Sequence, residues 1–149
     1  MSDNWLQFVP DDPNFQPSLE AAKDAEKMLA SYTPDAGSVV ATYHQSIVFF
    51  HPGGNWSGVE CPACGSDIET WWQDAMRDSA QNQFQDLMAS TPCCATHISL
   101  NELRYVWPAA FGRFVLEAMN PNVKDITLDQ EHLLSNRLGC KLRKVWVHL

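Results

Sequence analysis

Residues 38–51 read SVVATYHQSIVFFH and consist largely of β-branched and aromatic side chains. Such side chains favour extended backbone, so the stretch predicts either two strands or one long bent strand. Before it, apolar residues between Leu19 and Tyr32 recur at helical spacing, and Ser18 stands where a helix N-cap is expected. The centre of the fold is therefore expected to combine a helix with β-structure.

Further elements are expected on both sides of this stretch. The predicted strands are WLQFV (5–9), FGRFVLEAMN (111–120) and KLRKVWVHL (141–149). Three capping-box spacings predict helices, beginning at Ser66, Ser99 and Thr127, and the first helix would continue to about Leu87. This order predicts an α+β fold: a mostly antiparallel sheet with helices packed on one face. We expect one domain, residues 1–149, with a cysteine-bearing insertion at about 59–98.

The chain of 149 residues carries a formal net charge of −8, and its acidic residues are concentrated before residue 100. Residues 1–100 hold 13 acidic against 3 basic side chains, whereas residues 101–149 hold 5 against 7. An acidic field repels phosphate backbones, so we expect no nucleic-acid partner. DNA binding through Lys141, Arg143 and Lys144 is an alternative, but it would rest on three basic residues beside an acidic body. A cationic protein partner would be attracted.

No feature of the sequence indicates a membrane-bound or exported protein. The chain has no apolar run near the roughly 20 residues that a membrane-spanning helix needs. Its start, MSDNWLQFVPDDP, lacks the basic and apolar regions of a signal peptide. We therefore expect a cytoplasmic protein without a membrane partner, in which the five cysteines are metal ligands or free thiols.

Four of the cysteines form two short motifs. CPACG (61–65) places Cys61 and Cys64 three positions apart before a glycine, which suits a tight metal-binding turn. TPCCATH (91–97) offers Cys93 and Cys94, with His97 as an alternative fourth ligand. Because zinc takes about four such ligands in a tetrahedron, we predict a structural Zn²⁺ site at Cys61, Cys64, Cys93 and Cys94.

Two other uses of these cysteines remain open. A redox dithiol usually has its first cysteine at a helix N-terminus, where the helix dipole lowers the thiol pKa, but here the predicted helix begins after both cysteines. A small zinc-dependent hydrolase would need an open metal position. No GxSxG, HExxH, phosphate-loop or dinucleotide motif is present, so we expect no enzymatic activity. The fifth cysteine, Cys140, is expected to be a buried apolar-like side chain.

Three segments resemble a group of small, mostly uncharacterised bacterial proteins: GNWSGVECPACGSDIETWWQDAM (54–76), TPCCATHISLNELRYVWPAAFGRFVLEAMNPN (91–122) and LGCKLRKVWVHL (138–149). The resemblance spans nearly the whole chain and rests most on the two cysteine pairs and on Ser99–Phe114. In the similar sequences a glycine follows the paired cysteines, where this chain has Ala95.

The acidic charge and the missing catalytic motifs together favour a non-enzymatic protein-binding domain. By analogy with other small acidic proteins, we expect a cytoplasmic immunity protein that inhibits a bacterial toxin. Its partner would be a basic toxin domain, because charge complementarity speeds association and sets specificity. The expected partner-binding residues lie along the helix that follows the first cysteine motif: Glu69, Trp72, Asp74, Asp78 and Asp86.

Overall fold

The computed structural model describes residues 3–149, and an antiparallel sheet of four strands forms its centre. The strands, in the order in which they lie across the sheet, are β2 (Ser38–Phe50), β7 (Ala110–Met119), β1 (Asn4–Pro10) and β8 (Leu142–His148). The stretch quoted first is one long strand, because β2 pairs with β7 from Ser38 to Phe50. The expected bend lies at an irregularity between Tyr43 and Val48.

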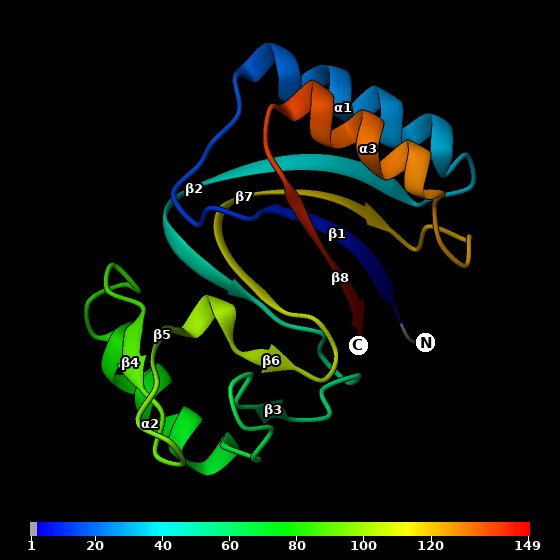
Figure 1. Ribbon diagram of the computed structural model, residues 1–149. Coiled ribbons are helices and arrows are strands. Elements are labelled where there is room, and N and C mark those ends of the chain that lie inside the picture. Colours follow the sequence, from blue (N-terminus) through cyan, green and yellow to red (C-terminus); the bar gives the residue numbers. More distant parts are fainter. Residues whose placement is uncertain (1–2) are drawn as a thin grey trace.

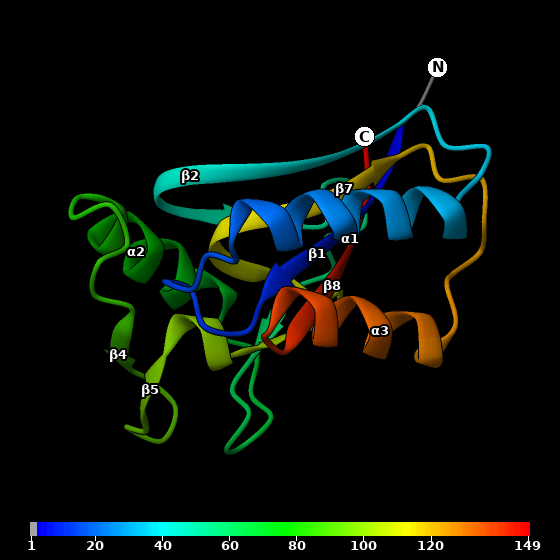
Figure 2. The same ribbon diagram turned by 90° about the horizontal axis from the view of Figure 1, so that it is seen from above.

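Two helices, α1 (Leu19–Tyr32) and α3 (Leu128–Leu138), lie side by side on one face of this sheet (Figures 1 and 2). The Ser18 hydroxyl accepts a hydrogen bond from the Ala21 amide, and the predicted capping box of Thr127 and Gln130 is formed. The apolar residues between helices and sheet are fully buried, among them Leu6, Phe8, Leu29, Phe114, Leu116 and Leu134. The predicted α+β fold is confirmed.

Between β2 and β7 the chain leaves the sheet and forms a second lobe, drawn in green in Figure 1. Its elements are β3 (Val59–Glu60), α2 (Glu69–Ala80), β4 (Met88–Ser90), β5 (His97–Ser99), the 3₁₀-helix η1 (Leu100–Glu102) and β6 (Arg104–Tyr105). The apolar core of this lobe includes Val59, Ile68, Leu100 and Leu103, and it packs against Phe111 at the start of β7. Because β6 pairs with β3, the excursion closes at Tyr105, beyond the expected limit near 98.

Two of the three predicted helix starts are wrong. Helix α2 begins at Glu69 with no side-chain cap, because the Ser66 carbonyl is already bonded to the Cys61 amide and belongs to the cysteine turn. Ser99 does cap the Asn101 amide, but only a single 3₁₀ turn follows. Helix α2 also ends at Ala80 rather than near Leu87, since the chain then turns back toward β4.

Buried Asn101 and the adjacent Arg143 connect the two lobes. The Asn101 side chain accepts a hydrogen bond from the Phe111 amide and donates one to the Asp11 carbonyl. Arg143 on β8 forms ion pairs with Asp11 and Glu102, each at 2.7 Å. Lys144 pairs with Asp125 at 2.8 Å. These carboxylates neutralise Arg143 and Lys144, two of the three basic residues of the C-terminal segment.

None of the helices within residues 3–149 is both long enough and apolar enough to span a lipid bilayer.

Candidate metal centre

The first cysteine motif is the turn of a short β-hairpin. Glu60 forms an antiparallel bridge with Asp67, and the residues between them make the turn. The Cys61 amide donates to the Ser66 carbonyl at 2.9 Å, and the Gly65 amide donates to the Cys61 carbonyl at 2.7 Å. Gly65 has φ of 77°, a left-handed conformation that glycine adopts without steric cost. The local sequence therefore suits the sharp turn.

The second motif is the turn of another hairpin, between β4 and β5, with Ser90 paired to His97. The Thr91 amide donates to the Thr96 carbonyl at 3.0 Å, and the Ala95 amide donates to the Thr91 carbonyl at 3.0 Å. Ala95 has φ of 54°, so an alanine here takes a conformation that usually favours glycine.

The two turns meet and bring four sulfur atoms together, those of Cys61, Cys64, Cys93 and Cys94. All four Sγ atoms lie within 4.8 Å of one another. The separations are 3.3 Å for Cys64–Cys93, 3.7 Å for Cys61–Cys94 and 3.9 Å for Cys93–Cys94. A tetrahedral zinc ion with Zn–S bonds of about 2.3 Å places its sulfurs about 3.8 Å apart, so the cluster can hold one such ion.

The surroundings of the four sulfurs are asymmetric. Cys61 is fully buried in the core of the second lobe, whereas Cys64, Cys93 and Cys94 are exposed. His97, the alternative fourth ligand, lies exposed in β5 and is not a member of the four-cysteine cluster. Cys140 is half-buried against the core of the first lobe, also outside the cluster.

Hydrogen bonds from neighbouring side chains set the acidity of the thiols. The hydroxyls of Thr91 and Thr96 lower the pKa of Cys94 to about 6. The Ser66 hydroxyl lowers the pKa of Cys64, while the hydrogen bond to Cys64 raises the pKa of Cys93 to about 12. Thiolates are the form of cysteine that binds a soft divalent metal ion, so binding of such an ion to this cluster would release thiol protons.

A stack of aromatic residues fixes the helix that follows the first turn. The rings of Trp56 and Trp72 lie 4.8 Å apart with planes inclined by 27°. The Trp72 indole N–H donates to the Tyr105 hydroxyl at 3.1 Å, and that hydroxyl donates to the Leu100 carbonyl at 2.7 Å. The predicted contact residue Trp72 is thus half-buried and engaged inside the lobe.

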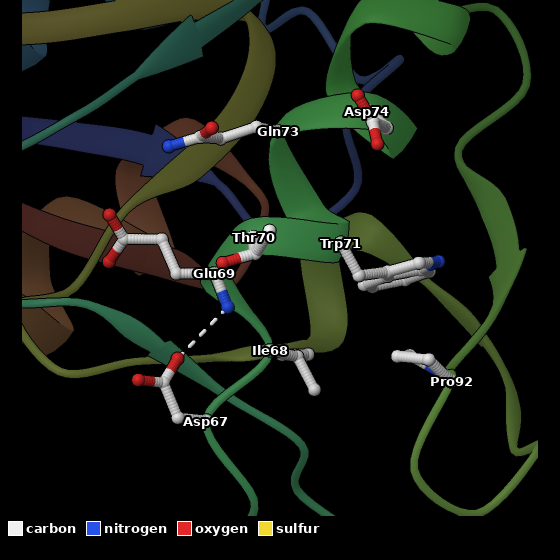
Figure 3. A pocket seen from close by; sticks show the side chains of 8 residues that line it. All are labelled: Asp67, Ile68, Glu69, Thr70, Trp71, Gln73, Asp74 and Pro92. Atoms are coloured by element: carbon white, nitrogen blue, oxygen red, sulfur yellow. Dashed lines mark hydrogen bonds between the residues drawn. The ribbon is translucent and has the colours of Figure 1, made fainter.

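Its neighbour Trp71 lies instead beside an open surface hollow of about 840 Å³ (Figure 3). The Trp71 ring extends toward Pro92 of the second cysteine turn, and Asp74 lies one helical turn further along α2. A second hollow of about 560 Å³ shares Trp71 and Asp74 and is lined also by Asp78 and Asp86. We name the two together the Trp71 face.

Four of the five predicted partner-binding residues line the Trp71 face: Glu69, Asp74, Asp78 and Asp86. Trp71 and Pro92 also line this face, and sequence reasoning did not select them. Two adjacent tryptophans on a helix point in different directions, and the sequence did not show which ring would meet Trp56.

Neither a protein-family model, nor a curated protein, nor a solved structure matches this chain.

Proposed function

We propose that this chain is a non-enzymatic protein-binding domain with a structural Zn²⁺ ion held by Cys61, Cys64, Cys93 and Cys94. In this proposal it is a cytoplasmic bacterial immunity protein that neutralises a toxin. The Trp71 face is the surface that docks on a basic domain of that toxin. Zinc is the preferred ion because four thiolates in a tetrahedron are a usual ligand set of structural zinc sites.

The proposal that the Trp71 face binds a partner rests on which elements form its walls. Helix α2 forms one wall and Pro92 of the second cysteine turn forms another. The first cysteine turn leads into α2, so a metal bound to both turns would hold the two walls in a fixed relation. A preorganised surface loses less conformational entropy on binding, which is what a structural metal would contribute here.

The charge of the face indicates the chemistry of the partner. Its lining residues include five carboxylates and no lysine or arginine: Asp67, Glu69, Asp74, Asp78 and Asp86. Arg77 of the same helix is exposed and pairs with Asp74 at 3.0 Å. Trp71 lies at the centre, where an aromatic anchor contributes most to protein association. A basic surface would be attracted by the carboxylates and anchored by the indole.

The ligand set supports a structural rather than a catalytic ion. A catalytic zinc site keeps one position open for water or substrate. Four sulfurs at tetrahedral separations would fill all positions, so a hydrolase would require the loss of one sulfur ligand.

The test uses the purified protein with toxin domains encoded by genes adjacent to its own. Asp74→Lys/Asp78→Lys reverses two charges on the Trp71 face. Asp35→Lys/Asp129→Lys makes the same change in net charge on exposed positions of the first lobe. We expect the first pair to slow association by about tenfold or more at low ionic strength, with a smaller effect at high salt. The control pair should have little effect.

In cells that produce the toxin, the unchanged protein and the control pair should protect, and Asp74→Lys/Asp78→Lys should protect less. The proposal is wrong if no adjacent-gene product binds, or if the control pair weakens binding as much as the Trp71-face pair.

A further inference from the structure

The two cysteine hairpins are equivalent when the chain is shifted by 30 positions. Residues 59–68 read VECPACGSDI, and residues 89–98 read ASTPCCATHI. With this shift, Pro62, Cys64 and Ile68 align with identical residues. Gly65 aligns with Ala95, and Ser66 aligns with Thr96. Three identities in ten positions are too few to reveal the relation from sequence alone, and the backbone reveals it.

The backbone hydrogen bonds repeat at the same shift. The bond from the Cys61 amide to the Ser66 carbonyl corresponds to the bond from Thr91 to Thr96, at 2.9 and 3.0 Å. The bond from the Gly65 amide to the Cys61 carbonyl corresponds to the bond from Ala95 to Thr91. The left-handed residues, Gly65 and Ala95, occupy equivalent positions with φ of 77° and 54°. The flanking bridges also correspond, Glu60 with Asp67 and Ser90 with His97.

The contacts of the last cysteine in each turn repeat as well. The Cys64 sulfur lies 3.3 Å from the Ser66 hydroxyl, and the Cys94 sulfur lies 3.0 Å from the Thr96 hydroxyl. Cys94 is therefore the counterpart of Cys64. The counterpart of Cys61 is Thr91, which carries no sulfur, while Cys93 corresponds to Ala63.

We propose that position 91 is a metal-ligand position occupied by threonine, and that Cys93 supplies the fourth sulfur from a displaced position in the same turn. This inference rests on the proposed metal site. The Thr91 side chain is 2% exposed, and its hydroxyl oxygen lies 3.5 Å from the Cys94 sulfur. That separation is close to one edge of the sulfur tetrahedron, about 3.8 Å. A sulfur on residue 91 can therefore take the place of the Cys93 sulfur.

The first test moves the ligand within the turn. Cys93→Ala removes one sulfur, and Thr91→Cys/Cys93→Ala returns a sulfur at position 91. Thr91→Ser/Cys93→Ala is the matched control, because it changes both positions without adding sulfur. The measurements are Zn²⁺ per chain by native mass spectrometry, Zn²⁺ affinity in competition with a chromogenic chelator, and the visible spectrum with Co²⁺.

We expect Cys93→Ala and the control to weaken Zn²⁺ binding by at least about 100-fold. Loss of a residue that only hydrogen-bonds to a metal ligand already costs up to about 100-fold, and these variants lose a ligand itself. Thr91→Cys/Cys93→Ala should bind within about tenfold of the unchanged protein and restore its four-sulfur Co²⁺ spectrum. Binding no better than that of Cys93→Ala overturns the inference. If the unchanged protein itself binds no metal, the proposed metal site is wrong as well. Failure of the metal site can therefore be told apart from failure of the inference about position 91.

Thr91→Cys alone gives a second test that retains every native cysteine and so does not depend on folding with a changed ligand set. Five thiols then compete for four metal positions. With Zn²⁺ bound, we expect iodoacetamide to modify Cys93 in this variant, whereas Cys93 of the unchanged protein stays protected. Equal protection of Cys93 in both proteins would overturn the inference.

Discussion

The Sγ atoms of Cys61 and Cys94 lie 3.7 Å apart, although 33 residues separate them in the chain. Cys61 directly follows β3, which pairs with β6, and Cys94 lies in the turn between β4 and β5. Two small hairpins are thus joined at their turns by sulfur rather than by a shared sheet. The first hairpin is closed by the single bridge between Glu60 and Asp67 and the second by three residue pairs, and such short pairings are marginal without further support.

Removal of the metal is expected to unfold the second lobe while the first lobe stays folded. The apolar cluster between the helices and the sheet is distinct from that of the second lobe, which is built mainly from residues 59–105 and borrows Ile47 of β2 and Phe111 of β7. Local opening of a weakly packed unit costs less free energy than global unfolding. Hydrogen exchange after chelation should show lost protection at 59–105 and retained protection in β1 and β8. Equal loss of protection in both lobes would contradict this expectation.

Replacement of Ala95 by glycine is expected to stabilise the protein, which is unusual for that substitution. Ala95 has φ of 54°, and a left-handed residue with a Cβ costs about 1–2 kcal/mol. Part of that gain is lost because glycine gives the unfolded chain more freedom. We expect a net gain of about 0.5–1 kcal/mol in urea unfolding. Ala63→Gly is the control, because Ala63 lies in a cysteine turn but has no positive φ, and this substitution should destabilise the protein.

Truncation of Trp72 tests the aromatic support of α2. Trp72→Ala removes the stack on Trp56 and the hydrogen bond to Tyr105, so we expect a loss of about 2–3 kcal/mol in unfolding free energy. Trp72→Phe keeps a ring and should lose about half as much. Trp71→Ala should change stability less, because Trp71 lines the open hollows. A larger loss for Trp71→Ala than for Trp72→Ala would show that the two rings have exchanged roles.

The pH dependence of stability should change in Tyr105→Phe. Burial raises the pKa of Tyr105 above its ordinary value of 10.0, so the folded state keeps the proton where the unfolded state loses it. This stability is fully present below pH 10 and is lost as the pH rises above 10. At pH 8 the variant should be about 1–2 kcal/mol less stable, because the bond to Leu100 is lost.

Between pH 8 and pH 11 the difference between Tyr105→Phe and the unchanged protein should shrink by about 1 kcal/mol, since only the unchanged protein loses the tyrosine contribution. Urea unfolding at both pH values measures it. A difference that stays constant would place the Tyr105 hydroxyl in contact with solvent.

The sequence predicted the elements whose signals are local and strong. The β-branched run gives β2, the helical spacing behind Ser18 gives α1, and the Thr127 capping box begins α3. The spacing of Cys61 and Cys64, with a second cysteine pair downstream, also led to the cluster that the structure contains.

Features that depend on long-range pairing were not predictable in the same way. Strands β4 and β5 have three residues each, which is too short for a periodic pattern. Ser66 has the spacing of a helix cap, but its carbonyl is bonded within the cysteine turn, and that pairing overrides the local signal. The different roles of Trp71 and Trp72 depend on where Trp56 lies, and Trp56 belongs to a distant loop.

The metal content of the purified protein tests the central claim most directly. Native mass spectrometry together with thiol alkylation gives both the ion per chain and the residues that hold it. We predict one Zn²⁺ per chain, with Cys61, Cys64, Cys93 and Cys94 protected from alkylation and Cys140 serving as the internal comparison. A folded protein with no bound metal and four reactive cysteines in the two turns would contradict the account.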